Sequence, residues 1–274
     1  MSAGGRGLHW PAVFALMEKD MRAVRRSKAV AIPMLAVPGV LLVVIPLVLV
    51  IVTTRSHSGD VTRFLGALPN GVSDPITSLP QHEQLIVLVN GFLLAPLFLI
   101  VPLMVSAVLA ADAFAGEKER KTLETLLHLP VRDQDLYAAK LLTAFVPAVV
   151  VAWVGFFLYA VVSNAVAWPV MHRAYVPTAQ WLAVILWVAP AVAALGLGIM
   201  VRVSARAQTA QGANQLGGAV IFPLVFLALG QATVLLAADL SVAIGVGAFV
   251  WAVAIMLTGR GARRFTRDGL ATAV

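Results

Sequence analysis

Six long runs of apolar residues constrain the fold of this chain more than any other feature of its sequence. They lie near residues 29–53, 85–111, 139–163, 180–201, 215–237 and 240–258. Each run is long enough to cross a bilayer, since a transmembrane helix needs roughly 20 apolar residues. Of the 274 residues, 60% are hydrophobic and 12% are charged, whereas about 25% are charged in a typical soluble domain. The sequence therefore predicts an all-α integral membrane protein with six transmembrane helices.

The distribution of positive residues predicts the orientation. Six crossings place both termini on one side, and only Arg55, Arg63 and Arg173 then face the other, which leaves 17 of the 20 Lys and Arg residues with the termini. Because cytoplasmic loops carry the excess of Lys and Arg, we expect a multi-pass protein of the cell membrane with both termini in the cytoplasm. The net charge of +7 then reflects orientation and contact with anionic membrane lipids, and nucleic acid is not an expected partner. The expected parts are a cytoplasmic N-terminus (1–28), a transmembrane domain (29–258) and a cytoplasmic tail (259–274).

An amphipathic helix is expected within the N-terminal segment, over residues 10–27. One of its faces is apolar and the other is charged. The apolar face comprises Trp10, Val13, Phe14, Met17, Met21 and Val24, and the charged face comprises Glu18, Lys19, Arg22, Arg25 and Arg26. These residues support two interpretations equally: an interfacial helix lying along the inner leaflet, or a plain membrane anchor.

The longest densely charged stretch, residues 111–142, lies between the second and third apolar runs. A helix cannot carry that charge through the bilayer core, so the stretch must lie in water or at the membrane face. We expect residues 117–121 to form a solvated first turn, after which Leu123, Leu126 and Leu127 fall at helical spacing on one face. The pattern predicts a short amphipathic coupling helix whose apolar face is free to dock on another molecule.

Signals for the end of one helix and the start of the next bound this segment. Pro130 ends the first helix, because the residue before a proline avoids the helical region. Asp133 is then positioned to cap a second helix, which returns to the membrane through Leu136. The whole cytoplasmic loop is expected over residues 112–138. A basic juxtamembrane loop that only sets orientation is the alternative, and it would need neither the acidic residues nor the ordered leucines.

The run EKERKTLETLLHLPVR, residues 117–132, is followed by Lys140 at the foot of the third apolar run. This pattern closely resembles the first cytoplasmic loop of the type-two ABC exporter permeases. In that family the loop is a coupling helix that docks into a cleft of the ATP-hydrolysing subunit. The resemblance implies that the charged residues make polar contacts with the ATPase and that the leucines supply the buried anchors. The implied ATPase-coupling residues are Glu117, Lys118, Glu119, Thr122, Leu123, Glu124, Leu126, Leu127 and Pro130.

The same resemblance implies the permease subunit of an ATP-driven exporter, which pairs with a cytoplasmic ATPase subunit and with a second permease copy or a paralogue. The sequence agrees with a separate ATPase, because it lacks the phosphate-binding motif G-x-x-x-x-G-K-S/T. ATP and Mg are therefore expected in the partner, and this chain is expected to carry no cofactor, metal or catalytic residue and not to be an enzyme. It has no cysteine, which excludes disulfides and thiolate metal sites.

Polar residues within the apolar runs are few. Asn90, Ser106, Ser163 and Gln231 are expected to form hydrogen bonds between helices, and Lys140 is expected to reach water from the end of its run. An ion-coupled carrier usually needs a buried carboxylate relay, and the runs show none. Such a carrier, or a membrane scaffold that recruits a soluble partner through the charged loop, is the alternative function. The apolar spans suit a lipid-like or amphipathic cargo, although they select no particular one.

The remaining loops are short. The polar, basic stretch 202–215 resembles the one that precedes the fifth span in the same family, where it is either a second contact with the ATPase or an ordinary turn. An external loop is expected over residues 164–178. Between the fifth and sixth runs only Ala238 and Asp239 are left to form a turn.

Overall fold

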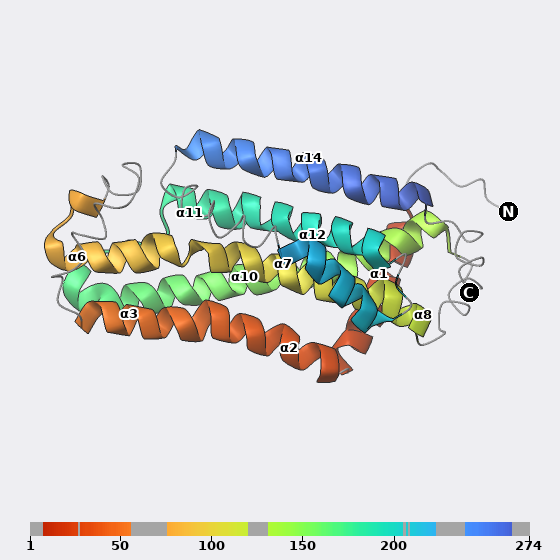
Figure 1. The fold of residues 1–274 in the computed structure, drawn as a ribbon, viewed down its shortest axis with the longest axis horizontal. Helices are drawn as coiled ribbons and strands as arrows, with labels where there is room; N and C mark the ends of the chain where they lie inside the picture. The colour runs from red at the N-terminus through yellow and green to blue at the C-terminus, as the bar shows by residue number, and fades with distance from the viewer. Residues whose placement is uncertain are drawn as a thin grey trace.

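The computed structural model describes residues 8–26, 28–55, 76–119, 131–204, 207, 209–222 and 239–264 (Figure 1). Within these ranges every regular element is helical, so the predicted all-α fold is confirmed. The helices are α1 (Trp10–Arg26), α2 (Lys28–Gly39), α3 (Ile45–Arg55), α6 (Gln81–Ile86), α7 (Ala95–Ala111), α8 (Glu117–Glu119), α10 (Asp133–Met171), α11 (Ala179–Ala183), α12 (Ala189–Ser204) and α14 (Leu240–Arg264). Four π-helical segments lie among them: η1 (Val40–Val44), η2 (Val87–Leu93), η3 (Asp112–Gly116) and η4 (Val184–Val188). Residues 210–222 form a further helix.

Five of the described helical stretches are long and apolar enough to cross a membrane. They are Met34–Arg55, Gln81–Gly116, Asp133–Met171, Ala179–Ser204 and Leu240–Gly261. This result agrees with a multi-pass membrane protein. The predicted fifth span, 215–237, is helical as far as residue 222, and residues 223–238, which include Gln231 and Ala238, lie outside the described ranges.

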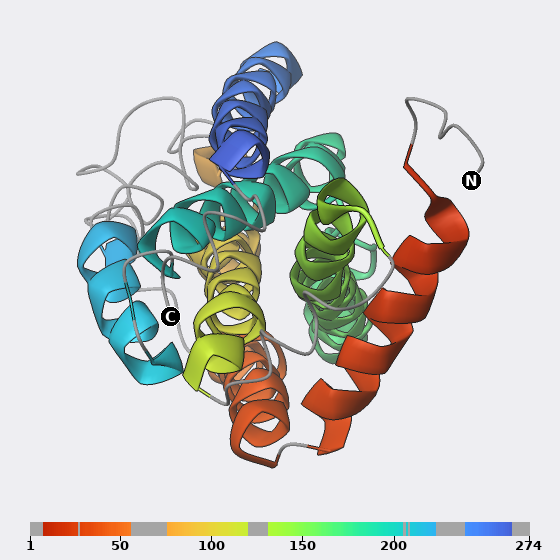
Figure 2. The ribbon, with the colours of Figure 1, turned by 90° about the vertical axis from the view of Figure 1, so that its right-hand side faces the viewer.

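The spans lie side by side along the long axis of the molecule, with α7 and α12 near its centre (Figures 1 and 2). In the most apolar stretch of each span, 72% of the residues are buried within the protein in Gln81–Gly116 and in Ala179–Ser204, but only 17% in Leu240–Gly261. Small residues let helices in a membrane approach closely, and Gly196 of α12 lies directly against Leu103 of α7. Peripheral helices instead expose large apolar side chains, as expected where a helix faces lipid.

One end of the bundle, which we call the α8 end, gathers segments that are far apart in the sequence. It contains α8, the first turns of α10 and the last turns of α12 and α14, and α1 lies across it (right-hand side of Figure 1). Helices α6 and α11 lie at the opposite end. The α8 end is the end that the distribution of positive residues assigns to the cytoplasm, an assignment that stays a prediction.

Helix α10 is longer than the predicted third span, 139–163. It runs for 39 residues from Asp133 to Met171, so the expectation that a loop begins at residue 164 is wrong. Asn164, the first residue of the expected loop, lies inside the helix, where its Nδ2 donates to the Ala160 carbonyl at 2.7 Å. Its Oδ1 accepts from the backbone N–H of Tyr175 at 2.9 Å. The polar side chain therefore fastens the following loop from within the helix, and the helix ends only before His172.

The π-helical segment η2 lies in the buried part of the second span. Pro96 follows η2 closely and has no backbone N–H to donate to a carbonyl of the preceding turn. A carbonyl inside a membrane that lacks this donor needs another one. The Gly91 carbonyl accepts from Trp181 Nε1 at 3.0 Å, and the Asn90 carbonyl accepts from the Tyr159 hydroxyl. The Asn90 side chain donates to Thr53 Oγ1 of α3 at 3.1 Å, which confirms the expected hydrogen bond between helices. Side chains from three other helices thus satisfy polar groups of η2.

Replacing Tyr159 with Phe is expected to destabilise the protein by about 1–2 kcal/mol, because the buried Asn90 carbonyl loses its side-chain donor. Thermal unfolding in lipid nanodiscs measures the effect. Tyr137→Phe is the matched comparison, since it removes a hydroxyl that donates at 2.9 Å to the Thr258 carbonyl within the regular helix α14. We expect this second change to cost less, and equal costs would contradict the assigned role of Tyr159 at η2.

Candidate functional site

The predicted coupling residues divide into two groups. Thr122, Leu123, Glu124, Leu126, Leu127 and Pro130 lie outside the described residues. The other three, Glu117, Lys118 and Glu119, form α8, and the structure describes the side chains of the two glutamates. The structure therefore shows how both flanks of the segment 120–130 are held, on one side by α8 and on the other by the start of α10.

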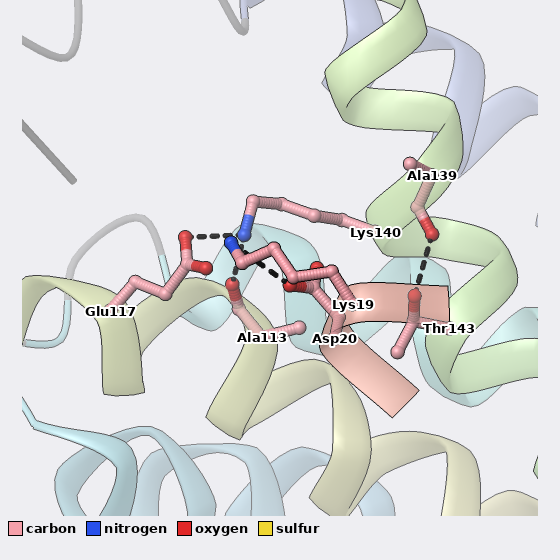
Figure 3. A network of polar contacts seen from close by, with 7 residues as sticks. All are labelled: Lys19, Asp20, Ala113, Glu117, Ala139, Lys140 and Thr143. Carbon is pink, nitrogen blue, oxygen red and sulfur yellow. Dashed lines mark hydrogen bonds and ion pairs between the residues drawn. The ribbon is translucent and has the colours of Figure 1, made fainter. Parts of the chain in front are cut away.

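Lys140 lies within the protein at the α8 end and not in water. Its side chain is 1% exposed, and its ammonium group forms an ion pair with the carboxylate of Glu117 (Figure 3). The same Nζ donates to the Ala113 carbonyl at 2.9 Å and lies 5.9 Å from the centre of the Phe114 ring. The expectation that water would satisfy Lys140 is wrong, because a carboxylate, a carbonyl and an aromatic face satisfy it instead.

The π-helical segment η3 arranges the acceptors around this ammonium group. It continues the second span from α7 into α8, and it carries both the Ala113 carbonyl and the Phe114 ring. Glu117 follows directly and is 8% exposed, so the expected solvated first turn is wrong at this residue. A buried charge is stable only when it is paired and hydrogen-bonded, and η3 with Glu117 meets both conditions for Lys140.

Glu119 points to a different partner. Its Oε2 accepts from the backbone N–H of Ala210 at 3.0 Å, at the first residue of the helix 210–222. Thr209 precedes that helix, and its Oγ1 accepts from the N–H of Gly212 at 2.9 Å. Thr209 is therefore the N-cap, and Glu119 supplies a second acceptor from a distant part of the chain. This contact joins the first charged loop to the polar stretch 202–215.

The first turn of α10 is held by the N-terminal part of the chain. Asp135 is 2% exposed, and its two oxygens accept from the backbone N–H of His9 at 2.9 Å and from Arg132 Nε at 3.0 Å. The N-cap position is Arg132, so the expectation that Asp133 caps the helix is wrong by one residue. A short-range signal could have indicated Asp135, because carboxylates are favoured in the first turn of a helix.

Helix α1 packs on the bundle along one edge of its predicted apolar face, where Val13 and Val24 are buried together with Leu16. Val13 and Leu16 pack against Leu136 and Ala139 of α10, whereas Phe14 of the predicted apolar face is 57% exposed. Figure 2 shows α1 crossing obliquely beside α10. The helix is therefore attached to the foot of the third span along one edge, and part of its apolar face is left open.

A family model described as "ABC-2 family transporter protein" matches residues 14–265. The chain belongs to this family. No curated protein and no solved structure is found to be similar to it. The match covers every described span and both flanks of the segment 120–130, so it bears out the resemblance carried by the charged loop.

Membership of the ABC-2 transporter family identifies the chain as the membrane subunit of a transporter. Such subunits are in general not enzymes, and the family implies association with an ABC ATPase. Among the residues that the structure describes, no three His, Asp or Glu side chains cluster as a metal site. At its α8 end the ABC-2 chain has the ion pairs Glu117–Lys140 and Arg132–Asp135, which lie at the two flanks of the segment 120–130.

Proposed function

We propose that this chain is the permease subunit of an ATP-driven ABC exporter. The observation that carries the proposal is the family match over residues 14–265. In this proposal the chain forms the translocation path with a second permease copy or a paralogue, and ATP with Mg binds in a separate cytoplasmic ATPase subunit. The apolar spans and the gathering of α8 and the charged helix ends at one end of the bundle support it (Figure 1).

The segment 120–130 is the proposed docking element. Leu123, Leu126 and Leu127 would be buried in the cleft of the ATPase, and the charged residues Lys118 and Glu124 would make polar contacts around them. Glu117 and Glu119, which the resemblance also implies as ATPase contacts, bind Lys140 and the Ala210 N–H within this chain. Two observations support this placement. The segment connects α8 to α10 in the chain, and each of these flanks is tied to another part of the protein by the Glu117–Lys140 and Asp135–His9 contacts. A loop whose flanks are rigid transmits a displacement, whereas a loosely tethered loop absorbs it.

The experiment that tests the proposal is co-purification followed by an ATP hydrolysis assay. The permease is co-expressed with a candidate ABC ATPase from the same genome, purified by a tag on the permease and placed in lipid nanodiscs. We expect the wild type to retain the ATPase and to hydrolyse ATP. The double variant Leu123→Asp, Leu127→Asp should bind the ATPase about 30-fold more weakly or worse, because a buried anchor is typically worth about 2 kcal/mol or more.

A matched control adds the same charge at the opposite end of the bundle. Gln81 and Ala174 are exposed there, and the double variant Gln81→Asp, Ala174→Asp should bind the ATPase like the wild type. A folded wild-type permease that retains no ATPase would reject the exporter. Transport that ignores ATP and stops when an ion gradient is removed would instead establish the ion-coupled carrier.

A further inference from the structure

Helix α8 is a short continuation of the second span. It has three residues, and the segment η3 joins it without a break to α7. Its two glutamates are two residues apart, which places them about 200° from each other around a helix with 3.6 residues per turn. Figure 2 shows this end of the second span between α10 on one side and the helix 210–222 on the other. The two carboxylates therefore reach in opposite directions.

The contact with α10 is closed to water. Glu117 is 8% exposed and Lys140 is 1% exposed, and the Ala113 carbonyl shares the ammonium group at 2.9 Å (Figure 3). Water cannot replace either partner, and salt screens a buried pair much less than an exposed one. This contact therefore joins the second and third spans through a buried ion pair.

The contact with the helix 210–222 is of the opposite kind. Glu119 is exposed, and it holds one backbone N–H, that of Ala210, at 3.0 Å. A carboxylate at a helix N-terminus is favoured by the helix dipole and by the unpaired N–H groups there. Water can take its place at small cost, so this contact can open and close.

We infer that Glu119 is a positioning residue that transmits displacement of the segment 120–130 to the helix 210–222. The inference rests on the proposed function, because it assumes that an ATPase moves that segment. Glu117 and Lys140 fix α8 to the third span. Glu119 supplies the second, releasable connection, so the helix 210–222 follows α8 only while that contact is closed.

The connection itself is tested on the permease alone, in nanodiscs, by hydrogen exchange read by mass spectrometry. Glu119→Ala should speed exchange of the first amides of the helix 210–222 about fivefold, the size of a lost helix cap. Glu119→Gln keeps an oxygen acceptor and should restore part of the protection. Glu18→Gln is the matched control: Glu18 is an exposed carboxylate in a pair with Arg22 at 2.5 Å on α1, and its loss should leave those amides unchanged. Unchanged exchange in Glu119→Ala would overturn the inference.

The transmission is tested with the ATPase bound. Glu119→Ala should keep the co-purified ATPase and lower its coupled hydrolysis about fivefold or more, a typical coupling between sites. Loss of ATPase binding, as expected for the Leu123 and Leu127 double variant, would show that Glu119 is a docking residue and would overturn the inference. Wild-type hydrolysis in Glu119→Ala would overturn it as well. If the wild-type permease binds no ATPase, the proposed function fails first, and the transmission role fails with it whatever the exchange data show.

Discussion

Glu117→Ala is expected to destabilise the permease by about 3–5 kcal/mol, the cost of removing one partner of a buried ion pair. The change leaves the ammonium group of Lys140 within the protein, where its side chain is 1% exposed, with the Ala113 carbonyl as its remaining hydrogen-bond acceptor among the contacts described above. The effect is measured as a fall in the apparent melting temperature of the permease in nanodiscs. ATPase is left out of this measurement, so the result is independent of the proposed function.

A double variant separates the burial of the charge from the loss of packing. Glu117→Leu combined with Lys140→Met removes both charges and keeps apolar volume, so it should recover most of the lost stability. Glu18→Ala is the matched control at an exposed pair, since the Glu18 side chain is 65% exposed, and it should cost at most about 1 kcal/mol. Equal losses from Glu117→Ala and Glu18→Ala would contradict the buried pair.

The helical fold was predictable from the sequence because it follows from local chemistry. An apolar run of about 20 residues has to satisfy its own backbone in lipid, which only a helix or a closed barrel does. The run 85–111 therefore becomes a helix whatever its neighbours are, and the observed span Gln81–Gly116 differs only at its ends. Those ends depend on tertiary contacts, as Asn164 shows by remaining helical and bonding forward to the loop.

The polar contacts of the α8 end were not predictable from spacing. Glu117 and Lys140 are 23 positions apart. Because each lies at the end of an apolar run, the sequence alone predicts that water solvates both side chains. Their pairing depends on η3, which presents the Ala113 carbonyl toward α10, and no periodicity indicates a π-helical turn. The Glu119–Ala210 contact joins residues 91 positions apart. It requires the second span and the helix 210–222 to be neighbours, which hydropathy does not reveal.

The apolar face of α1 also shows that sequence spacing does not reveal which helix lies next to another. Helical periodicity places Trp10, Val13 and Phe14 on one apolar face. The structure buries Val13 and Leu16 and exposes Trp10 and Phe14. Periodicity indicates only the mean direction of the apolar side chains, whereas the buried edge depends on which helix lies next to it. Here that helix is α10, and its small Ala139 admits Val13 and Leu16.

Gly196→Leu is expected to destabilise the protein by about 3 kcal/mol, the upper part of the range for overpacking a tight interface. A Cβ at this position would lie 2.6 Å from Leu103 Cδ1 and 2.9 Å from the Leu103 carbonyl oxygen. The side chain of Leu103 could rotate away, but its carbonyl belongs to the backbone of α7 and cannot. The two central helices would have to separate, which loosens the most buried seam of the bundle, so the apparent melting temperature in nanodiscs should fall markedly.

Gly245→Leu is the matched control, because the same side chain enters a helix at a place where nothing lies within 4 Å of the new Cβ. Replacing a helical glycine by leucine in open space removes backbone freedom from the unfolded chain and favours the helix by several tenths of a kcal/mol. We therefore expect Gly245→Leu to leave the melting temperature unchanged or to raise it. If both variants melted alike, the loss at Gly196 would follow from the added bulk alone, and close contact between α7 and α12 would not be what holds the centre of the bundle together.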